Sequence, residues 1–326
     1  MIKKRIGWLD ICKGIGIILV ILGHVYSDAH PVKIWIYSFH MPLFFFVSGY
    51  LKGQFKKKTT FKEKIIALII PYVELLVVQI AFYFFIERRF HTFTMGPIWF
   101  LLALFGVEIL NENMLIKERK WLICASVAIF AAIHYLSESV ISTFQESLSV
   151  WVSILCCGSI FYLLGGIVQS LQGAKFFGVV KNGYCRFIGG VILAVLSTLL
   201  AKVNGNVNMY FGKYSNIFIY YLAAISGIML VIAVGKWLNS NSFLEYMGQN
   251  TLLIMGTHRQ ILLVLLYIAS KVLRMDSTIL RDKWYMTLLL TISIICVEFI
   301  LIWILKKLRS ASKASVADIL LKWVKI

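Results

Sequence analysis

Ten long apolar runs follow one another along almost the whole chain, and no other feature of the sequence limits the fold as strongly. Each run has roughly the 17–25 residues that an α-helix needs to cross a bilayer. Inside lipid, every backbone polar group must be satisfied by the protein, and uniformly apolar runs meet this condition as helices. The runs are residues 8–27, 34–51, 65–86, 97–115, 121–137, 150–169, 187–203, 217–235, 250–270 and 284–305. We therefore predict an all-α, polytopic integral membrane protein with about ten transmembrane helices.

Composition and charge agree with this prediction. Of the 326 residues, 60% are hydrophobic and only 15% are charged, whereas soluble domains are about half apolar and a quarter charged. A net charge of +18 would suggest a nucleic-acid partner in a soluble protein. Here Lys and Arg lie mainly in the loops, and they are densest in the loops on the side of the N-terminus. The positive-inside rule then predicts that both termini are cytoplasmic, and we expect no nucleic-acid partner.

The loops leave room for no second domain. We predict a membrane domain over residues 1–305 and a short basic cytoplasmic tail over residues 306–326, which can form one amphipathic surface helix. The basic loop 52–58 is expected to contact anionic membrane lipid, or alternatively to help hold an anionic substrate. The six cysteines fall mostly inside apolar runs, without metal-ligand spacing. We therefore predict no disulfide framework, no metal and no bound cofactor, and the sequence is silent on oligomeric state.

Ionisable residues inside membrane spans are costly, so each is a candidate for function. The first span contains Asp10, Lys13 and His24. Lys13 and His24 lie about three helical turns apart, so they share a face and are separated by roughly 16 Å along the axis. Asp10 lies near the same face and could orient Lys13 by charge pairing. Lys13 could instead extend to the membrane interface, and His24 could make only a hydrogen bond between helices.

Further candidates for substrate binding lie in four other spans. Pro42 should kink the second helix two residues after a histidine and open a cavity there. The ninth span carries a mid-span His-Arg pair that could stabilise an oxyanion, with Glu74 or Glu108 as possible partners of the arginine. A tryptophan at the outer end of the fourth span suits either the lipid interface or sugar stacking, and an asparagine could cap the ninth helix. The candidates are His40, Glu74, Trp99, Asn250, His258 and Arg259.

Several of these stretches resemble one family. The run from Asp10 to His24 is similar to the first-helix signature of the acyltransferase-3 family of membrane O-acyltransferases, and Phe39-His-Met-Pro-Leu-Phe-Phe-Phe-Val-Ser-Gly-Tyr is similar to its second-helix signature, particularly in the fucose 4-O-acetylase-like branch. Pro97-Ile-Trp-Phe-Leu, Phe161-Tyr-Leu-Leu-Gly-Gly and the run from Gly248 to His258 resemble later family elements in consistent order. One departure is that the family usually has Arg where this chain has Lys13.

The resemblance implies a fold of about ten helices that acylates hydroxyls of extracytoplasmic glycans from a cytoplasmic acyl-coenzyme A. The residues independently suit such a reaction, because acyl transfer to an alcohol needs a base near pH 7 and His is the usual choice. We predict that His24 is the base, that Lys13 meets the anionic part of coenzyme A, and that acetyl-CoA is a donor substrate. The expected acceptor is a cell-envelope or exported polysaccharide, and the expected location is a bacterial-type plasma membrane.

Two functions from other classes also fit the sequence. Buried His, Arg and Glu side chains suit an ion-coupled transporter or a flippase for a glycan or lipid-linked sugar. Such a carrier should show paired, interrupted helices in two halves, and the sequence shows none. The other alternative is a membrane domain that only senses or assembles, in which His24 would be dispensable.

Overall fold

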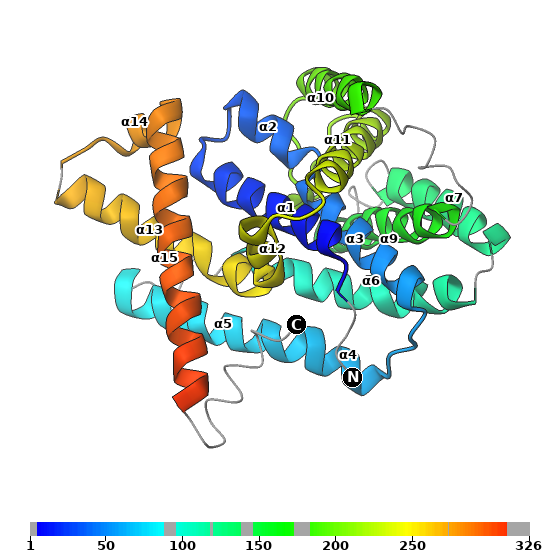
Figure 1. The fold of residues 1–326 in the computed structure, drawn as a ribbon, viewed down its shortest axis with the longest axis horizontal. Coiled ribbons are helices and arrows are strands. Elements are labelled where there is room, and N and C mark those ends of the chain that lie inside the picture. Colours follow the sequence, from blue (N-terminus) through cyan, green and yellow to red (C-terminus); the bar gives the residue numbers. More distant parts are fainter. Residues whose placement is uncertain are drawn as a thin grey trace. The chain divides into compact units, whose positions relative to one another are not determined.

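The computed structural model describes residues 5–87, 96–117, 120–137, 146–172, 183–272 and 274–311, and over these residues the protein is helical. The described residues form no strand, apart from one isolated bridge between Asn208 and Lys213. The prediction of an all-α fold is confirmed (Figure 1). The α-helices are α1 (Gly7–Val25), α2 (Pro31–Tyr37), α3 (His40–Phe55), α4 (Phe61–Lys64), α5 (Ile70–Phe82), α6 (Trp99–Ile116), α7 (Lys120–Leu136), α9 (Glu146–Gln172), α10 (Gly183–Asn204), α11 (Ile217–Leu238), α12 (Ser242–Gln249), α13 (Thr251–Lys271), α14 (Ser277–Asp282) and α15 (Trp284–Ala311).

Nine helical segments of the described chain are long and apolar enough to cross a membrane. They coincide with nine of the ten predicted spans, and the tenth, at Trp121–Leu136, is a shorter apolar helix. Several segments expose large apolar side chains, as α10 does with Ile192, Val195 and Leu199. Such faces would be unfavourable in water and suit contact with lipid. The protein is thus a multi-pass membrane protein, while the orientation of its termini stays a prediction.

The chain divides into two compact units, each assembled from separate parts of the sequence. The first unit comprises Met1–Lys33, Ile66–Phe100 and Asn239–Ile326, and the second comprises Ile34–Ile65 and Leu101–Leu238. The last helix of the first unit, α15, continues to Ala311, so the beginning of the predicted tail is helical. The rest of that tail lies outside the described residues.

In the first unit, α1 crosses α12 at very short range (Figure 1). A Cβ at Gly14 would overlap the backbone of Leu244, and a Cβ at Gly248 would overlap the backbone of Asp10. Small residues at these positions let the two backbones touch, as is common between membrane helices. Helices α1, α13 and α15 also pack against one another, and this three-helix arrangement holds most of the predicted site.

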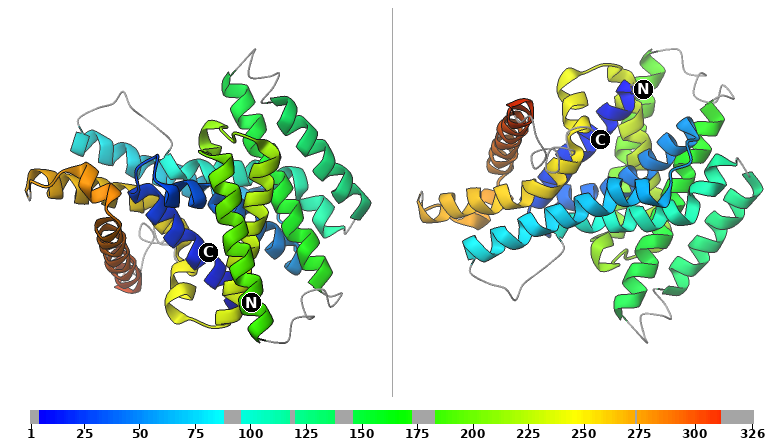
Figure 2. Two further views of the ribbon diagram at one scale, coloured as in Figure 1. Left: turned by 90° about the horizontal axis from the view of Figure 1, so that it is seen from above. Right: turned by 90° about the horizontal axis from the view of Figure 1, so that it is seen from below.

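In the second unit, α3 packs along α9 in the same manner, with Gly49 against the carbonyl of Tyr162 and Gly165 against that of Phe46. Helices α10 and α11 lie side by side (Figure 2). The described loop between them is held by Asn204, which donates to the Tyr214 carbonyl.

The second predicted span is interrupted rather than kinked at Pro42. The break lies at Ser38 and Phe39, between α2 and α3, and Pro42 occupies the first turn of α3. A proline ring clashes with the carbonyl four residues earlier, which here belongs to Ser38, and proline is tolerated in a first helical turn. The proline therefore sets the interruption, but it does so one turn upstream of the predicted position.

Candidate functional site

The first helix holds Asp10 and Lys13 as an ion pair. Lys13 Nζ lies 2.6 Å from Asp10 Oδ1, and the two side chains are 21% and 9% exposed. Because α12 covers the backbone of Asp10 at Gly248, the carboxylate is fixed where the two helices cross. The charge pairing predicted from the spacing is present, and it keeps the Lys13 ammonium at this crossing.

Near the other end of α1, His24 meets His258 of α13. The two ring centroids are 5.1 Å apart, with an angle of 44° between the ring planes. His258 is fully buried, and its Nδ1 lies 2.7 Å from the carbonyl oxygen of Ile254. A carbonyl can only accept, so Nδ1 carries the proton and Nε2 presents a lone pair. Nε2 makes no hydrogen bond with the described residues, so the ring that packs against the predicted catalytic histidine keeps one unsatisfied acceptor.

The end of α1 next to His24 is fastened by Arg281 of α14. Arg281 Nε donates to the carbonyl of Val25 at 3.0 Å, and Nη2 donates to that of Tyr26 at 3.2 Å. The last carbonyls of a helix lack intrahelical partners, and a cation there also complements the helix dipole. Arg281 was not a candidate from the sequence, because no local pattern links this loop residue to α1. In the segment that follows α1, Lys33 lowers the pKa of Asp28, first through a hydrogen bond to the carboxylate and then through the positive charge of the ammonium.

On α13, Arg259 lies next to His258 and is partly buried. It forms no ion pair with Glu74 or with any other described residue of the first unit. The predicted pairing with Glu74 is therefore absent, and Glu108 belongs to the second unit. Arg259 lies near Gly96, since a Cβ at that glycine would be 3.6 Å from Arg259 Nη1.

Sequence analysis missed Glu298 of α15. It is fully buried, and its Oε1 lies 2.7 Å from Oγ1 of Thr257, the residue before His258. The same hydroxyl lies 2.8 Å from the carbonyl of Leu253. The Thr257 hydroxyl has one hydrogen to donate to these two acceptors, and a neutral Glu298, able to donate to Thr257, would let both contacts be hydrogen bonds. The rule that flagged Glu74 applies equally to Glu298, so the sequence did contain the signal.

Three predicted substrate residues have structural contacts. His40 Nδ1 donates to the carbonyl of Ile36 at 2.9 Å, across the break between α2 and α3. Trp99 is buried and meets Phe100 edge to face, so it is not an exposed belt residue. Asn250 precedes α13 but makes no side-chain cap bond to it; its Nδ2 donates to the carbonyl of Tyr246 instead. Asn250 does occupy the cap position at the start of α13, but the expected side-chain capping bond is absent. Substrate roles for these residues stay predictions.

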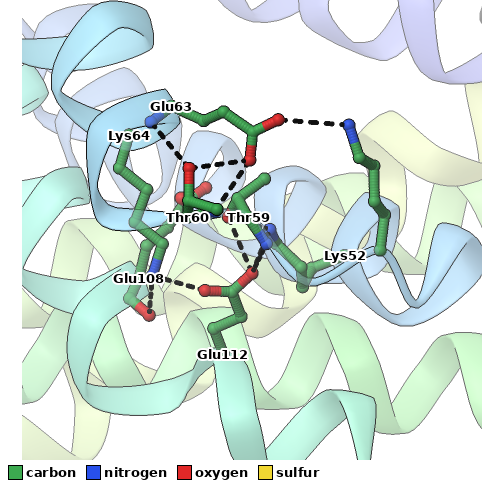
Figure 3. A network of polar contacts seen from close by, with 8 residues as sticks. Lys52, Thr59, Thr60, Glu63, Lys64, Glu108 and Glu112 are labelled. Carbon is green, nitrogen blue, oxygen red and sulfur yellow. Dashed lines mark hydrogen bonds and ion pairs between the residues drawn. The ribbon is translucent and has the colours of Figure 1, made fainter.

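In the second unit, part of the basic loop folds inward onto one buried carboxylate (Figure 3). Lys52 Nζ lies 2.9 Å from Glu112 Oε1, and Lys64 pairs with Oε2 of the same group. The backbone N–H and the hydroxyl of Thr59 also donate to Oε1, each at 2.7 Å. The lysines at positions 56–58 stay exposed, whereas Lys52 is engaged with Glu112; contact of the basic loop with lipid or an anionic substrate stays a prediction. Within the described residues, no group of His, Cys, Asp and Glu side chains is arranged to hold a metal ion.

The chain matches a known protein family over almost its whole length. Residues 6–307 match the acyltransferase-3 family, described as an acyltransferase domain. A curated relative, nodulation protein NolL of Sinorhizobium fredii (strain NBRC 101917 / NGR234), is 31% identical over 151 residues. That alignment covers 37% of this chain and 40% of the relative, so the chain spans less than half the length of NolL. No solved structure matches the chain.

Proposed function

Because this chain belongs to the acyltransferase-3 family, we propose that it transfers an acetyl group from acetyl-CoA to a hydroxyl of a cell-envelope or exported polysaccharide. Family membership and the apolar helices make the protein a multi-pass membrane acyltransferase. The acetyl donor, the polysaccharide acceptor and a bacterial-type plasma membrane are the further steps of the proposal. The observation that carries them is the pair of imidazoles, His24 and His258, inside a helical membrane unit.

The proposed reaction moves one proton and one acyl group. As the acceptor oxygen attacks the thioester carbon, His24 removes the hydroxyl proton; the C–O bond forms, the C–S bond breaks, and the coenzyme A thiolate leaves and takes up the proton. General base catalysis of this kind accelerates the reaction by about 10²–10⁴-fold. A route through an acyl-histidine intermediate, in which His24 attacks first, uses the same residue and gives the same products. The buried His258 ring, whose centroid lies 5.1 Å from that of His24, supports either route by packing against the imidazole and holding it in place.

Lys13 supports the proposed use of a coenzyme A donor. Its ammonium is held by Asp10 on the same helix as His24, about three turns away. Pantetheine is a long arm, and a cation at one end of that span can meet the phosphates while the thioester reaches the imidazole. Lys binds phosphate as a point charge without the fork of Arg, so the Asp10 pair matters for fixing its position.

The family match favours acyl transfer over the transporter alternative, and one experiment tests the proposal directly. The O-acetyl content of envelope polysaccharide should rise when the intact protein is expressed, and should return to background with His24→Ala at equal membrane abundance. His30→Ala is the matched control, since His30 stacks on Tyr26 outside the membrane span and has no assigned role. Unchanged acetylation with His24→Ala would remove His24 as the base. No added acetyl with the intact protein would refute the proposed function.

A further inference from the structure

Arg259 carries a positive charge that no described residue of its own unit neutralises. It lies within α13, one of the segments apolar enough to cross a membrane, and it makes no ion pair or hydrogen bond with the described residues of the first unit. A guanidinium cannot lose its proton under physiological conditions. Unlike a lysine, it therefore cannot avoid the cost of burial by becoming neutral. An arginine in such a position needs an anion or a water-filled cavity.

Gln79 of α5 presents an unsatisfied acceptor in the same unit. It is 1% exposed, and its Oε1 has no hydrogen-bond partner among the described residues. Its other amide atom is engaged when the Gln260 amide takes the orientation that satisfies its own neighbours, because Gln79 Nε2 then donates to the Gln260 side-chain oxygen at 3.3 Å. Gln260 is fixed in turn, since its NH₂ group donates to the carbonyls of Gly256 and Thr257. These bonds fix the amide of Gln79 and leave its oxygen without a donor among the described residues.

The two unsatisfied groups border one point, beside the backbone of Gly96. An atom at the Cβ position of Gly96 would lie 3.3 Å from Gln79 Nε2, 3.5 Å from Gln79 Oε1 and 3.6 Å from Arg259 Nη1, so the Gln79 amide and the guanidinium both border this point. Gly96 has φ +52°, a conformation that favours glycine, so the absence of a side chain there is built into the turn. The preceding segment 88–95 contains two arginines and no acidic residue, so it provides no carboxylate for Arg259.

We propose that Arg259 and Gln79, beside Gly96, form the acceptor subsite and select a sugar that bears an anionic substituent, a carboxylate or a phosphate. The guanidinium fork receives the anion, for which its planar geometry is well suited. Gln79 Oε1 accepts a hydrogen bond from a ring hydroxyl of the same or the adjoining sugar. Arg259 directly follows His258, and His258 contacts the ring of His24, so the subsite and the proposed reaction centre are built on the same part of α13. This inference rests on the proposed function and adds the chemical class of the acceptor.

The competing role for Arg259 is stabilisation of the oxyanion that forms on the acetyl group. The two roles differ in what Arg259 contributes before the reaction. An anionic substituent neutralises the arginine in the bound complex, so loss of either the substituent or the arginine weakens acceptor binding. An oxyanion exists only near the transition state, so loss of its stabiliser lowers kcat with every acceptor. The kinetic constants for one polysaccharide with and without its anionic groups therefore separate the roles.

The test uses the purified full-length protein in lipid nanodiscs, which leave both membrane faces accessible. The probes are radiolabelled acetyl-CoA and envelope polysaccharide from the bacterium that expresses the protein. The polysaccharide is tested in three separate forms. The first is untreated, the second has its carboxylates reduced to alcohols by carbodiimide and borohydride, and the third has its phosphates removed by cold hydrofluoric acid. We expect one treatment to raise the wild-type KM for polysaccharide roughly 30-fold or more, as for loss of one partner of a buried charge pair, with little change in kcat. The effective treatment identifies the substituent.

Arg259→Gln should give the same high KM with all three polysaccharides, because the variant lacks the guanidinium that binds the anion. Lys271→Gln is the matched control: it removes an exposed positive charge from the end of α13 and should keep the wild-type pattern. The inference is overturned if neither treatment changes the wild-type KM, a result that needs no variant to fold. It is also overturned if Arg259→Gln lowers kcat equally on every form without changing KM. Absence of label in every wild-type reaction would instead refute the proposed function itself.

Discussion

The Glu112→Gln substitution would show how much the buried ion cluster contributes to the second unit. Glu112 accepts four bonds, from Lys52, Lys64 and both donors of Thr59. The side chains of Glu112, Lys52 and Lys64 are only 4%, 10% and 8% exposed, so water cannot replace the lost partner. Breaking a buried ion pair costs about 3–5 kcal/mol. Glutamine keeps one oxygen as an acceptor, so we expect the free energy of unfolding to fall by about 3 kcal/mol, at the lower end of that range.

The assay is reversible unfolding of the purified protein by SDS in mixed micelles, followed by circular dichroism. Glu63→Gln is the matched control, because Glu63 lies near the same loop and pairs with Lys57 at 3.5 Å, but the two side chains are 47% and 66% exposed. Exposed pairs contribute about 0–1 kcal/mol, and glutamine can maintain the capping box that Glu63 makes with Thr60. The control should therefore lose about 1 kcal/mol or less.

Equal losses in the two variants would refute the argument, since they would mean that water reaches Glu112 in the folded protein. A further variant tests the cause of the loss. When Glu112→Leu is combined with Lys52→Met and Lys64→Met, no charge remains unpaired, and replacing a whole buried ion group by apolar residues is often neutral. The triple variant should therefore be more stable than Glu112→Leu alone. If it is less stable, unpaired charge is not what destabilises the single variant.

Three further predictions concern the first unit. Glu298→Gln should change the free energy of unfolding in SDS by less than about 1 kcal/mol, because an amide donates to Thr257 as a protonated acid does; a larger loss would indicate an ionised Glu298. Gly248→Ala should sharply reduce the yield of folded protein in size-exclusion chromatography, whereas Gly189→Ala, where a Cβ meets nothing within 4 Å, should not. Arg281→Gln should lower kcat severalfold while leaving the KM for acetyl-CoA unchanged, with partial recovery in Arg281→Lys; a change confined to that KM would contradict the positioning role.

The membrane helices could be predicted from the sequence because the bilayer imposes one length and one polarity on every span. That constraint acts locally, so each run of apolar residues identifies its own helix without knowledge of its neighbours. The Asp10–Lys13 pair was accessible for the same reason, since both residues lie within one turn of one helix. The break before α3 was placed wrongly because Pro42 was taken as the point of bending. The steric conflict of a proline ring falls on the carbonyl one turn earlier.

The site itself depends on contacts between helices that are far apart in sequence. Sequence analysis selected both His24 and His258, but no local pattern could show that their rings meet. The partner expected for Arg259 was a glutamate, whereas the structure provides Gln79 and the backbone of Gly96 as its surroundings. The buried amides of Gln79 and Gln260 were not among the candidates, because the search within spans rested mainly on ionisable side chains. In a membrane protein, a buried amide with an unsatisfied oxygen is as informative as a charge.

The position of His24 is determined from both ends of α1. At one end, contact between the backbones of α1 and α12 at Gly14 and Gly248 leaves no space for sliding or rotation. At the other end, Arg281 holds the carbonyls of Val25 and Tyr26, so the last turn cannot fray beside the histidine. A general base is effective only when it is held within hydrogen-bonding reach of the proton that it removes. A helix fixed at both ends supplies that geometry before any substrate binds, which explains why α1, rather than a loop, carries the proposed base.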